Sequence, residues 1–80
     1  MHSTPTATVI RLRTDRFNQR ARELGLASNL ACAEYIGIDQ STLGRIRRGE
    51  VLPGERFIAA CLSSKFARSF EGLFELGEAS

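Results

Sequence analysis

The stretch that decides the fold is NLACAEYIGIDQSTLGRIRRG, residues 29–49. It holds two apolar patterns of helical period separated by a glycine, and each pattern is too short to persist as a helix alone. Ala33 is small where two crossing helices would touch, and Gly37 tolerates the positive φ of a tight turn. Ile38 follows as an apolar residue that can fill the core at the exit of the turn. We therefore predict two short helices over residues 29–48, joined by a turn of about three or four residues.

The second of these helices, predicted from about Gln40 to Arg48, has an inner apolar face and an outer polar face. Leu43 and Ile46 recur at helical spacing on the inner face. The outward positions are Gln40, Ser41, Gly44, Arg45 and Arg48. A glutamine amide can pair with an adenine edge, and an arginine can pair with O6 and N7 of guanine. This pattern predicts a helix that enters the major groove of duplex DNA by its N-terminal end.

Gly44 is unexpected within this helix, because glycine costs about 1 kcal/mol relative to alanine in a helix interior. Two interpretations stay open for it. In the first, the missing side chain lets the helix lie close to a base pair or a thymine methyl group. In the second, the residue has no role and occupies an exposed position by drift.

The chain before this stretch is predicted to form a strand and a helix. Thr8–Leu12 is rich in β-branched residues and is expected to be a short strand. Thr14 or Asp15 can cap a helix whose apolar residues recur at helical spacing, and Gly25 supplies a stop. The first seven residues, rich in Ser, Thr and Pro, are expected to be disordered.

Capping residues predict the remaining helix ends. The expected starts are Ser28 or Asn29, Asp39, Pro53 and Ser69, and the expected stops are Gly37 and Gly49. The last helix would carry Phe70, Leu73 and Phe74. The sequence as a whole predicts one compact all-α domain over residues 1–80, with five short helices around a single core.

The composition excludes several classes of protein. With 80 residues, 42% hydrophobic and 25% charged, the chain is expected to be one soluble globular domain. No apolar run approaches the roughly 20 residues that span a bilayer. The first eight residues lack a basic-then-apolar signal pattern, so we expect a cytoplasmic protein with no membrane partner.

Metal, cofactor and enzyme chemistry find no support in the sequence. Cys32 and Cys61 lie in apolar stretches without a CxxC pairing, and His2 is the single histidine. A zinc site needs about four ligands, so we predict no metal and two buried, inert thiols rather than a disulfide. No nucleophile–base pair or phosphate loop is present. We expect no cofactor, no small-molecule ligand and no catalytic activity.

The charges are unevenly distributed along the chain. Basic residues gather at Arg45, Arg47 and Arg48, and again at Arg11, Arg13, Arg16, Arg20 and Arg22. Acidic residues without compensating bases gather at Glu71, Glu75 and Glu78. This distribution favours a molecule with basic stretches facing a polyanion and an acidic end facing away. The alternative interpretation is that these charges only solvate helix faces.

Residues 32–49, CAEYIGIDQSTLGRIRRG, resemble the helix-turn-helix of the Cro/C1 (XRE) family of phage and bacterial repressors. The matching positions are Ala33, Gly37, Ile38, Leu43 and Ile46, the Gln-Ser start of the second helix and its Arg48-Gly49 end. The likeness extends from about residue 14 to residue 76. Two departures are Arg47, where the family often has an acidic residue or Asn, and Cys32, where Leu is common.

The resemblance implies a lambda-repressor-like fold and a transcriptional repressor that binds an operator, commonly as a homodimer on an inverted repeat. It implies base-reading roles for Gln40, Ser41, Gly44 and Arg45. Phosphate contacts are expected for Asn29, Thr42, Arg47 and Arg48. A Cro-like or immunity repressor of a phage or prophage is the favoured type. An antitoxin and a helix-turn-helix module for protein interaction are the alternatives.

Two features stay open at the level of sequence. Arg11 and Arg13 could form an arm that contacts the minor groove or the DNA backbone, but we favour the solvated face of a short strand. That strand would pair with the chain near residues 74–76 or with a second subunit. A dimer surface is expected in the C-terminal region around Phe66, Phe70, Leu73 and Phe74. We favour the core for Phe70 and Leu73.

Overall fold

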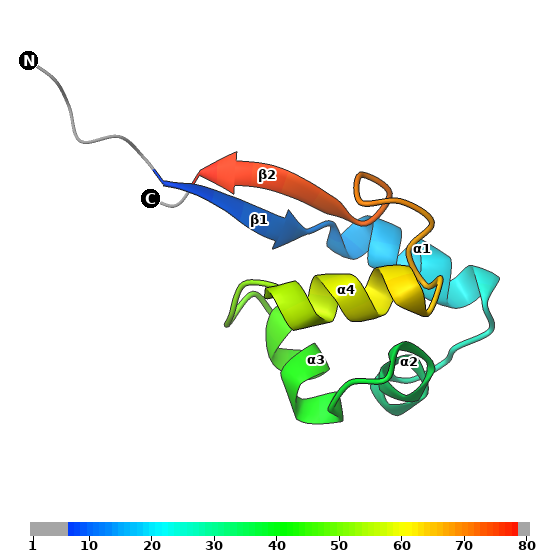
Figure 1. Ribbon diagram of the computed structural model, residues 1–80. Coiled ribbons are helices and arrows are strands. Elements are labelled where there is room, and N and C mark those ends of the chain that lie inside the picture. The colour runs from blue at the N-terminus through cyan, green and yellow to red at the C-terminus, as the bar shows by residue number, and fades with distance from the viewer. Residues whose placement is uncertain (1–6, 79–80) are drawn as a thin grey trace, which may run out of the picture.

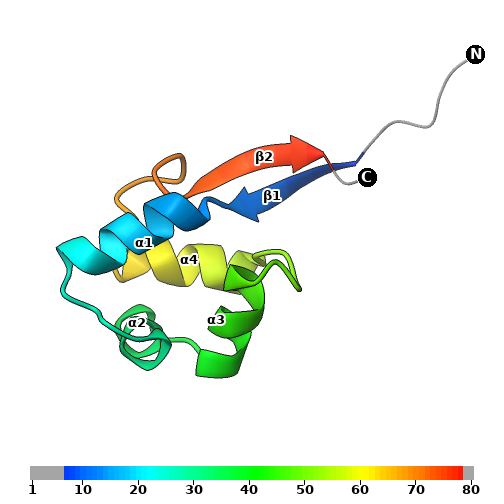
Figure 2. The ribbon, with the colours of Figure 1, turned by 180° about the vertical axis from the view of Figure 1, so that it is seen from behind.

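The computed structural model describes residues 7–78, so most of the predicted disordered start lies outside the described residues. The elements are β1 (Thr8–Leu12), α1 (Thr14–Glu23), α2 (Asn29–Ile36), α3 (Gln40–Arg47), α4 (Glu55–Ser63) and β2 (Phe74–Glu78). The sheet lies above α4 and α3 lies below it (Figure 1). From behind, α1 passes in front of α4 (Figure 2). The domain is mostly helical.

The prediction of five helices is wrong at the C-terminus, since the described chain has four helices and a two-stranded sheet. Ser69 does cap a turn, because its hydroxyl accepts from the backbone N–H of Gly72 at 3.2 Å. The turn ends at once, and Phe74 begins β2. From Phe74 onward, apolar and polar residues alternate with period two, which suits a strand whose backbone groups bond to β1.

The predicted strand at Thr8–Leu12 is confirmed, and it pairs with β2 as one of the two expected partners. The pairing is antiparallel and runs from Thr8 opposite Glu78 to Leu12 opposite Phe74. Directly opposed residues share a face of the sheet. One face therefore carries Ile10, Leu12, Phe74 and Leu76, and it packs on the helices at all of these positions except Leu76, which is 67% exposed.

Most of the predicted helix ends agree with the structure. The Ser28 hydroxyl accepts from the Ala31 N–H at 3.0 Å, and Gly37 ends α2 in the left-handed conformation with φ of 89°. Asp39 caps α3 by accepting from the Thr42 N–H at 3.1 Å. Two predicted starts differ: α1 begins at Thr14 without a side-chain cap, and α4 begins two residues after Pro53.

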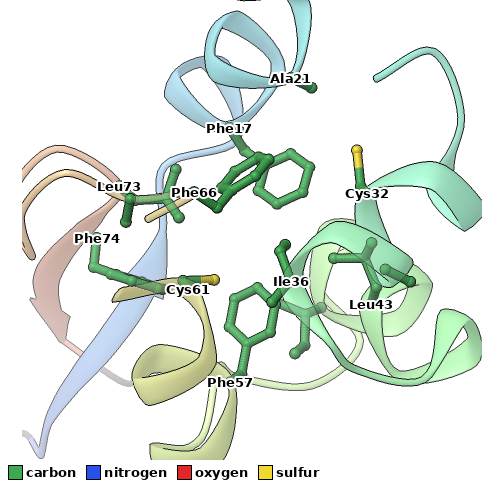
Figure 3. Packing of buried hydrophobic residues seen from close by; sticks show 13 residues of the cluster. Phe17, Ala21, Cys32, Ile36, Leu43, Phe57, Cys61, Phe66, Leu73 and Phe74 are labelled. Atoms are coloured by element: carbon green, nitrogen blue, oxygen red, sulfur yellow. The ribbon is translucent and has the colours of Figure 1, made fainter. Parts of the chain in front are cut away.

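One aromatic and aliphatic core joins all the elements (Figure 3). Phe17 of α1 packs against Phe66 with ring centroids 4.7 Å apart, and Phe57 of α4 meets Phe74 of β2 at 6.0 Å. Leu43 of α3 is fully buried against the same cluster. The core therefore fixes the inner side of α3 and leaves its outer side facing away from the protein.

The C-terminal aromatic residues are mostly core rather than surface. Phe66, Leu73 and Phe74 are each at most 1% exposed, so they cannot form the dimer surface that the sequence left open for them. Phe70 is half-buried and stacks on Phe74. Cys32 and Cys61 are free and buried, as predicted, and burial raises the pKa of the Cys61 thiol to about 12.

None of the helices within residues 7–78 combines the length and the apolar character needed to cross a membrane.

Candidate nucleic-acid interface

The α2–α3 pair presents a polar surface opposite the core. The two helices are joined by the three residues 37–39 and are the helix pair in closest mutual contact. Gln40, Ser41 and Arg45 are exposed on the outer side of α3, while Leu43 and Ile46 are buried on its inner side. The short turn and the two buried residues together hold the outer side of α3 in one orientation.

Six of the predicted contact residues line one shallow depression on this surface. The lining residues are Asn29, Gln40, Ser41, Gly44, Arg45 and Arg48. The structure thus gathers all four predicted base-reading residues and two of the predicted phosphate contacts in one place. We call this set of six residues, of which Asn29 belongs to α2 and the other five to residues 40–48, the outer surface of α3. Its lining consists mainly of hydrogen-bonding groups and cationic side chains. Such groups suit a nucleic acid, which offers anionic phosphates and hydrogen-bonding base edges.

Thr42 lies beside the outer surface but its polar groups already have a partner. Its N–H donates to the Asp39 carboxylate at 3.1 Å, and its hydroxyl donates to the same oxygen at 3.4 Å. The hydroxyl oxygen keeps lone pairs but its proton is used. A phosphate contact by Thr42 would therefore require the hydroxyl to exchange Asp39 for the phosphate.

Arg47 is directed inward, in contrast to the phosphate contact expected from the sequence. Its guanidinium donates to the side-chain oxygens of Asn18 and Asn29 and lies 4.7 Å from the centre of the Phe17 ring. These contacts connect α3 to α1 and α2. The signal was present in the sequence, because Arg47 follows Leu43 by one helical turn and so shares its inner side. The guanidinium is occupied within the protein, which disfavours the predicted phosphate contact.

The contact with Arg47 also orients Asn29. Since the Asn29 side-chain oxygen accepts from Arg47, its NH2 group remains as a donor. Asn29 is the first residue of α2, next to the N-terminal backbone amides of that helix. An amide donor beside a helix N-terminus is a favourable arrangement for a phosphate oxygen.

Arg48 lies across the outer side of α3 and pairs with Glu50. Its Nε donates to Glu50 Oε2 at 2.6 Å, and its Nη2 donates to Oε1 at 3.4 Å. The hydrogen bond from Arg48 lowers the pKa of the Glu50 carboxyl, and the same bond raises the pKa of Arg48. The same guanidinium covers Gly44, which is buried although it belongs to the outer side.

Arg11 and Arg13 bond to the C-terminal segment rather than extending as an arm. Arg11 Nη2 donates to the backbone oxygen of Glu78 at 3.0 Å, and Arg13 Nη1 donates to that of Glu71 at 3.3 Å. Both residues therefore support the sheet and the turn before it. The strand interpretation of this segment is confirmed.

The second predicted basic region is partly used for structure as well. Arg20 donates from Nε to the Phe66 backbone oxygen at 2.7 Å and from Nη2 to that of Lys65 at 3.0 Å. These bonds hold a segment in which Lys65 has a positive φ of 66°. Among the charged residues, Arg45 and Arg48 are therefore the cations placed on the outer surface of α3.

The part of the chain that the structure describes contains no group of three His, Cys, Asp or Glu side chains that could hold a metal ion. Comparison of the chain with protein-family models, with curated proteins and with solved structures finds no match.

Proposed function

We propose that this protein binds duplex DNA sequence-specifically as a transcriptional repressor of the Cro/C1 type, with α2 and α3 acting as a helix-turn-helix. The observation that carries the proposal is the contrast between the two sides of α3. Leu43 and Ile46 anchor its inner side in the core, while its outer side exposes Gln40, Ser41 and Arg45. A rigidly held helix with a polar, cationic outer side fits the major groove.

In this proposal Gln40 and Arg45 read base edges, with Ser41 as a smaller contact. Glutamine suits adenine, and arginine suits guanine. Asn29 contacts a phosphate through its NH2 group, and the N-terminal end of α2 supports that contact electrostatically. Thr42 is a further phosphate contact if its hydroxyl exchanges Asp39 for the DNA backbone. The lambda-repressor-like assignment rests on the sequence resemblance in residues 32–49 together with this arrangement of helices.

We propose that the protein acts as a homodimer, because a single module of this size buries only about 600–1,000 Å² on DNA. The surface for the second copy lies between α4 and the sheet. An apolar groove there is lined by Ile10, Ile58, Leu62 and Phe70. Leu76 lies opposite Ile10 on the same face of the sheet and is 67% exposed. Packing of two such faces would cover the exposed apolar side chains of both copies.

The dimer surface is tested by adding a charge to either face of the sheet. Leu76→Asp should give a monomer in sedimentation equilibrium and remove cooperative binding to an inverted repeat, while the affinity for a half-site stays unchanged. Val9→Asp adds the same charge to the same sheet on its opposite face, since Val9 pairs with Gly77, and should leave the dimer intact. An unchanged dimer in Leu76→Asp would assign dimerisation to another surface.

The function itself is tested by selecting bound sequences from a randomised duplex pool at about 150 mM salt, where the Debye length is about 8 Å and weak surface attraction is screened. Enrichment of an inverted repeat with half-sites about one helical turn apart is the expected result. Weak, salt-sensitive binding without enrichment would overturn the proposal. It would favour the alternative of a helix-turn-helix module for protein interaction; the antitoxin alternative, which also binds DNA, would be favoured by a neighbouring toxin gene.

A further inference from the structure

Gly44 of α3 lies beneath the side chain of Arg48. An ideal Cβ at this residue would lie 3.0 Å from Arg48 Nη1 and 3.8 Å from Arg48 Cζ. The shorter distance is tighter than an ordinary van der Waals contact. Helical side chains point back toward the helix N-terminus, so residue 48 naturally extends over residue 44. The missing side chain leaves the space in which the Arg48 guanidinium lies.

Glu50 is held by the backbone in the position from which it bonds Arg48. Gly49 has a positive φ of 78°, its N–H donates to the Ile46 oxygen at 3.1 Å, and the Glu50 N–H donates to the Arg45 oxygen at 2.9 Å. This pair of bonds is a Schellman motif, which fixes the chain just past a helix end. The Glu50 carboxylate is therefore attached to a defined point at the end of α3.

The pairing with Glu50 uses the donors on one edge of the Arg48 guanidinium and leaves those on a second edge unbonded within the described protein. Nε and Nη2 donate to the carboxylate, while Nη1 lies over Gly44. The end-on edge, formed by Nη1 and the second hydrogen of Nη2, keeps its donors. Arg48 lines the same depression as Gln40, Ser41 and Arg45. Two parallel N–H donors in a fixed plane match O6 and N7 of guanine.

The charge of the pair argues against a phosphate contact. A phosphate-binding arginine contributes through its net positive charge and the counterions that its binding releases. Glu50 neutralises that charge locally, but it keeps the guanidinium plane and its remaining donors in place. The pair is thus better suited to hydrogen-bond readout than to electrostatic attraction.

We infer that Arg48 is a base-reading residue for a guanine, that Glu50 is the positioning residue that orients its guanidinium, and that Gly44 provides the space. The inference rests on the proposed DNA-binding function and revises the phosphate contact expected for Arg48. It also gives Gly44 a third interpretation, different from close approach to the DNA and from drift: its missing side chain leaves room for the guanidinium of Arg48.

The test compares sequence preferences after selection from a randomised duplex pool, for wild type and for three variants. Arg48→Lys keeps the charge but loses the two-donor edge. It should lose the preference for guanine at one position, by about tenfold, and keep the other positions. Glu50→Gln should weaken the same position, whereas Glu71→Gln, a matched charge change in the turn before β2, should leave every position unchanged.

Gly44→Ala separates this effect from folding. Alanine favours the helix, so the melting temperature should rise, while its Cβ shifts the guanidinium by a few tenths of an ångström and should weaken the same guanine position less than Arg48→Lys does. An unchanged guanine preference in Arg48→Lys, or in Glu50→Gln, would overturn the inference alone, whatever uniform gain of affinity the lost Glu50 charge produces. Absence of any enriched sequence with wild-type protein would overturn the proposed function and the inference together.

Discussion

Arg47 and Arg48 are neighbours in the chain, yet they belong to opposite sides of α3. Arg47 is directed toward the protein, where it bonds Asn18 and Asn29 and covers Phe17. Arg48 is exposed and lies along the outer side of the same helix, paired with Glu50. One arginine thus stabilises the fold, and its neighbour in the chain remains available to a ligand. Successive residues of an α-helix are rotated by about 100° about its axis, and this one step separates the two side chains.

The inner side of α3 should therefore determine stability, and the outer side should determine binding. Leu43 and Ile46 on the inner side are at most 5% exposed, whereas Arg45 on the outer side is exposed. Substitutions on the two sides are expected to have separable effects. Each of the following changes tests whether the separation holds.

The largest effect is expected for Leu43→Ala, which removes a fully buried side chain. The free energy of unfolding should fall by about 2–5 kcal/mol, because the lost transfer free energy adds to the cost of a cavity. Urea denaturation followed by circular dichroism measures this change. Under conditions where the variant is folded, its sequence preference should match wild type. An altered preference would show that the two sides of α3 are coupled.

Arg45→Ala is the counterpart on the outer side. It should cost about 1–3 kcal/mol in binding to the preferred operator and relax the preference at one base position. The free energy of unfolding should change by less than about 0.5 kcal/mol, as is usual for exposed residues. Titration of labelled duplexes that differ at single positions measures the loss. An equal loss for every duplex would assign Arg45 to the DNA backbone.

Arg47→Met is expected to have a smaller effect, mainly on stability, and any loss of affinity through Asn29 should be equal for all sequences. Methionine keeps an apolar stem near Phe17 but leaves Asn18 and Asn29 without their donor, so the free energy of unfolding should fall by about 1–2 kcal/mol. A double-mutant cycle with Asn18→Ala measures the pairwise contribution. The dependence of binding on salt is the discriminating control. A slope lowered by about one would show that Arg47 contacts a phosphate after all.

The sequence was sufficient to predict the α2–α3 pair because several local signals coincide there. Ser28 and Asp39 cap the starts of α2 and α3, and Gly37 ends α2, at the places predicted. Capping depends on the chemistry of one residue and its immediate neighbours, so it can be recognised without knowledge of the fold. The exposed positions on the outer side of α3, to which base-reading roles are proposed, follow from the same local periodicity.

The C-terminal segment was not predicted correctly, because long-range contacts decide it. Phe70, Leu73 and Phe74 have helical spacing, yet Phe74 begins a strand whose partner is Leu12, far away in the sequence. The position of the Arg48 guanidinium was missed for a different reason. Gly44 lies four residues before Arg48 and Glu50 lies two residues after it, but helical period alone does not say which side-chain conformation Arg48 takes at the end of α3.

The smallest effects are expected from the two capping residues, Ser28 of α2 and Asp39 of α3. Each side chain accepts a backbone hydrogen bond, at 3.0 Å and 3.1 Å respectively. Replacement by alanine should lower the free energy of unfolding by about 1 kcal/mol in either case. Thermal or urea denaturation should therefore place the two variants close together.

Binding should distinguish these two variants although stability does not. Asp39 immediately precedes Gln40, so Asp39→Ala also removes a negative charge beside the proposed DNA surface. At low salt, Asp39→Ala should bind every duplex more tightly than Ser28→Ala does. The difference should shrink as salt shortens the Debye length from about 30 Å at 0.01 M to about 8 Å at 0.15 M. Equal binding of the two variants at low salt would place the N-terminal end of α3 away from the DNA backbone, and a groove-binding role for its outer side would then lose its geometric basis.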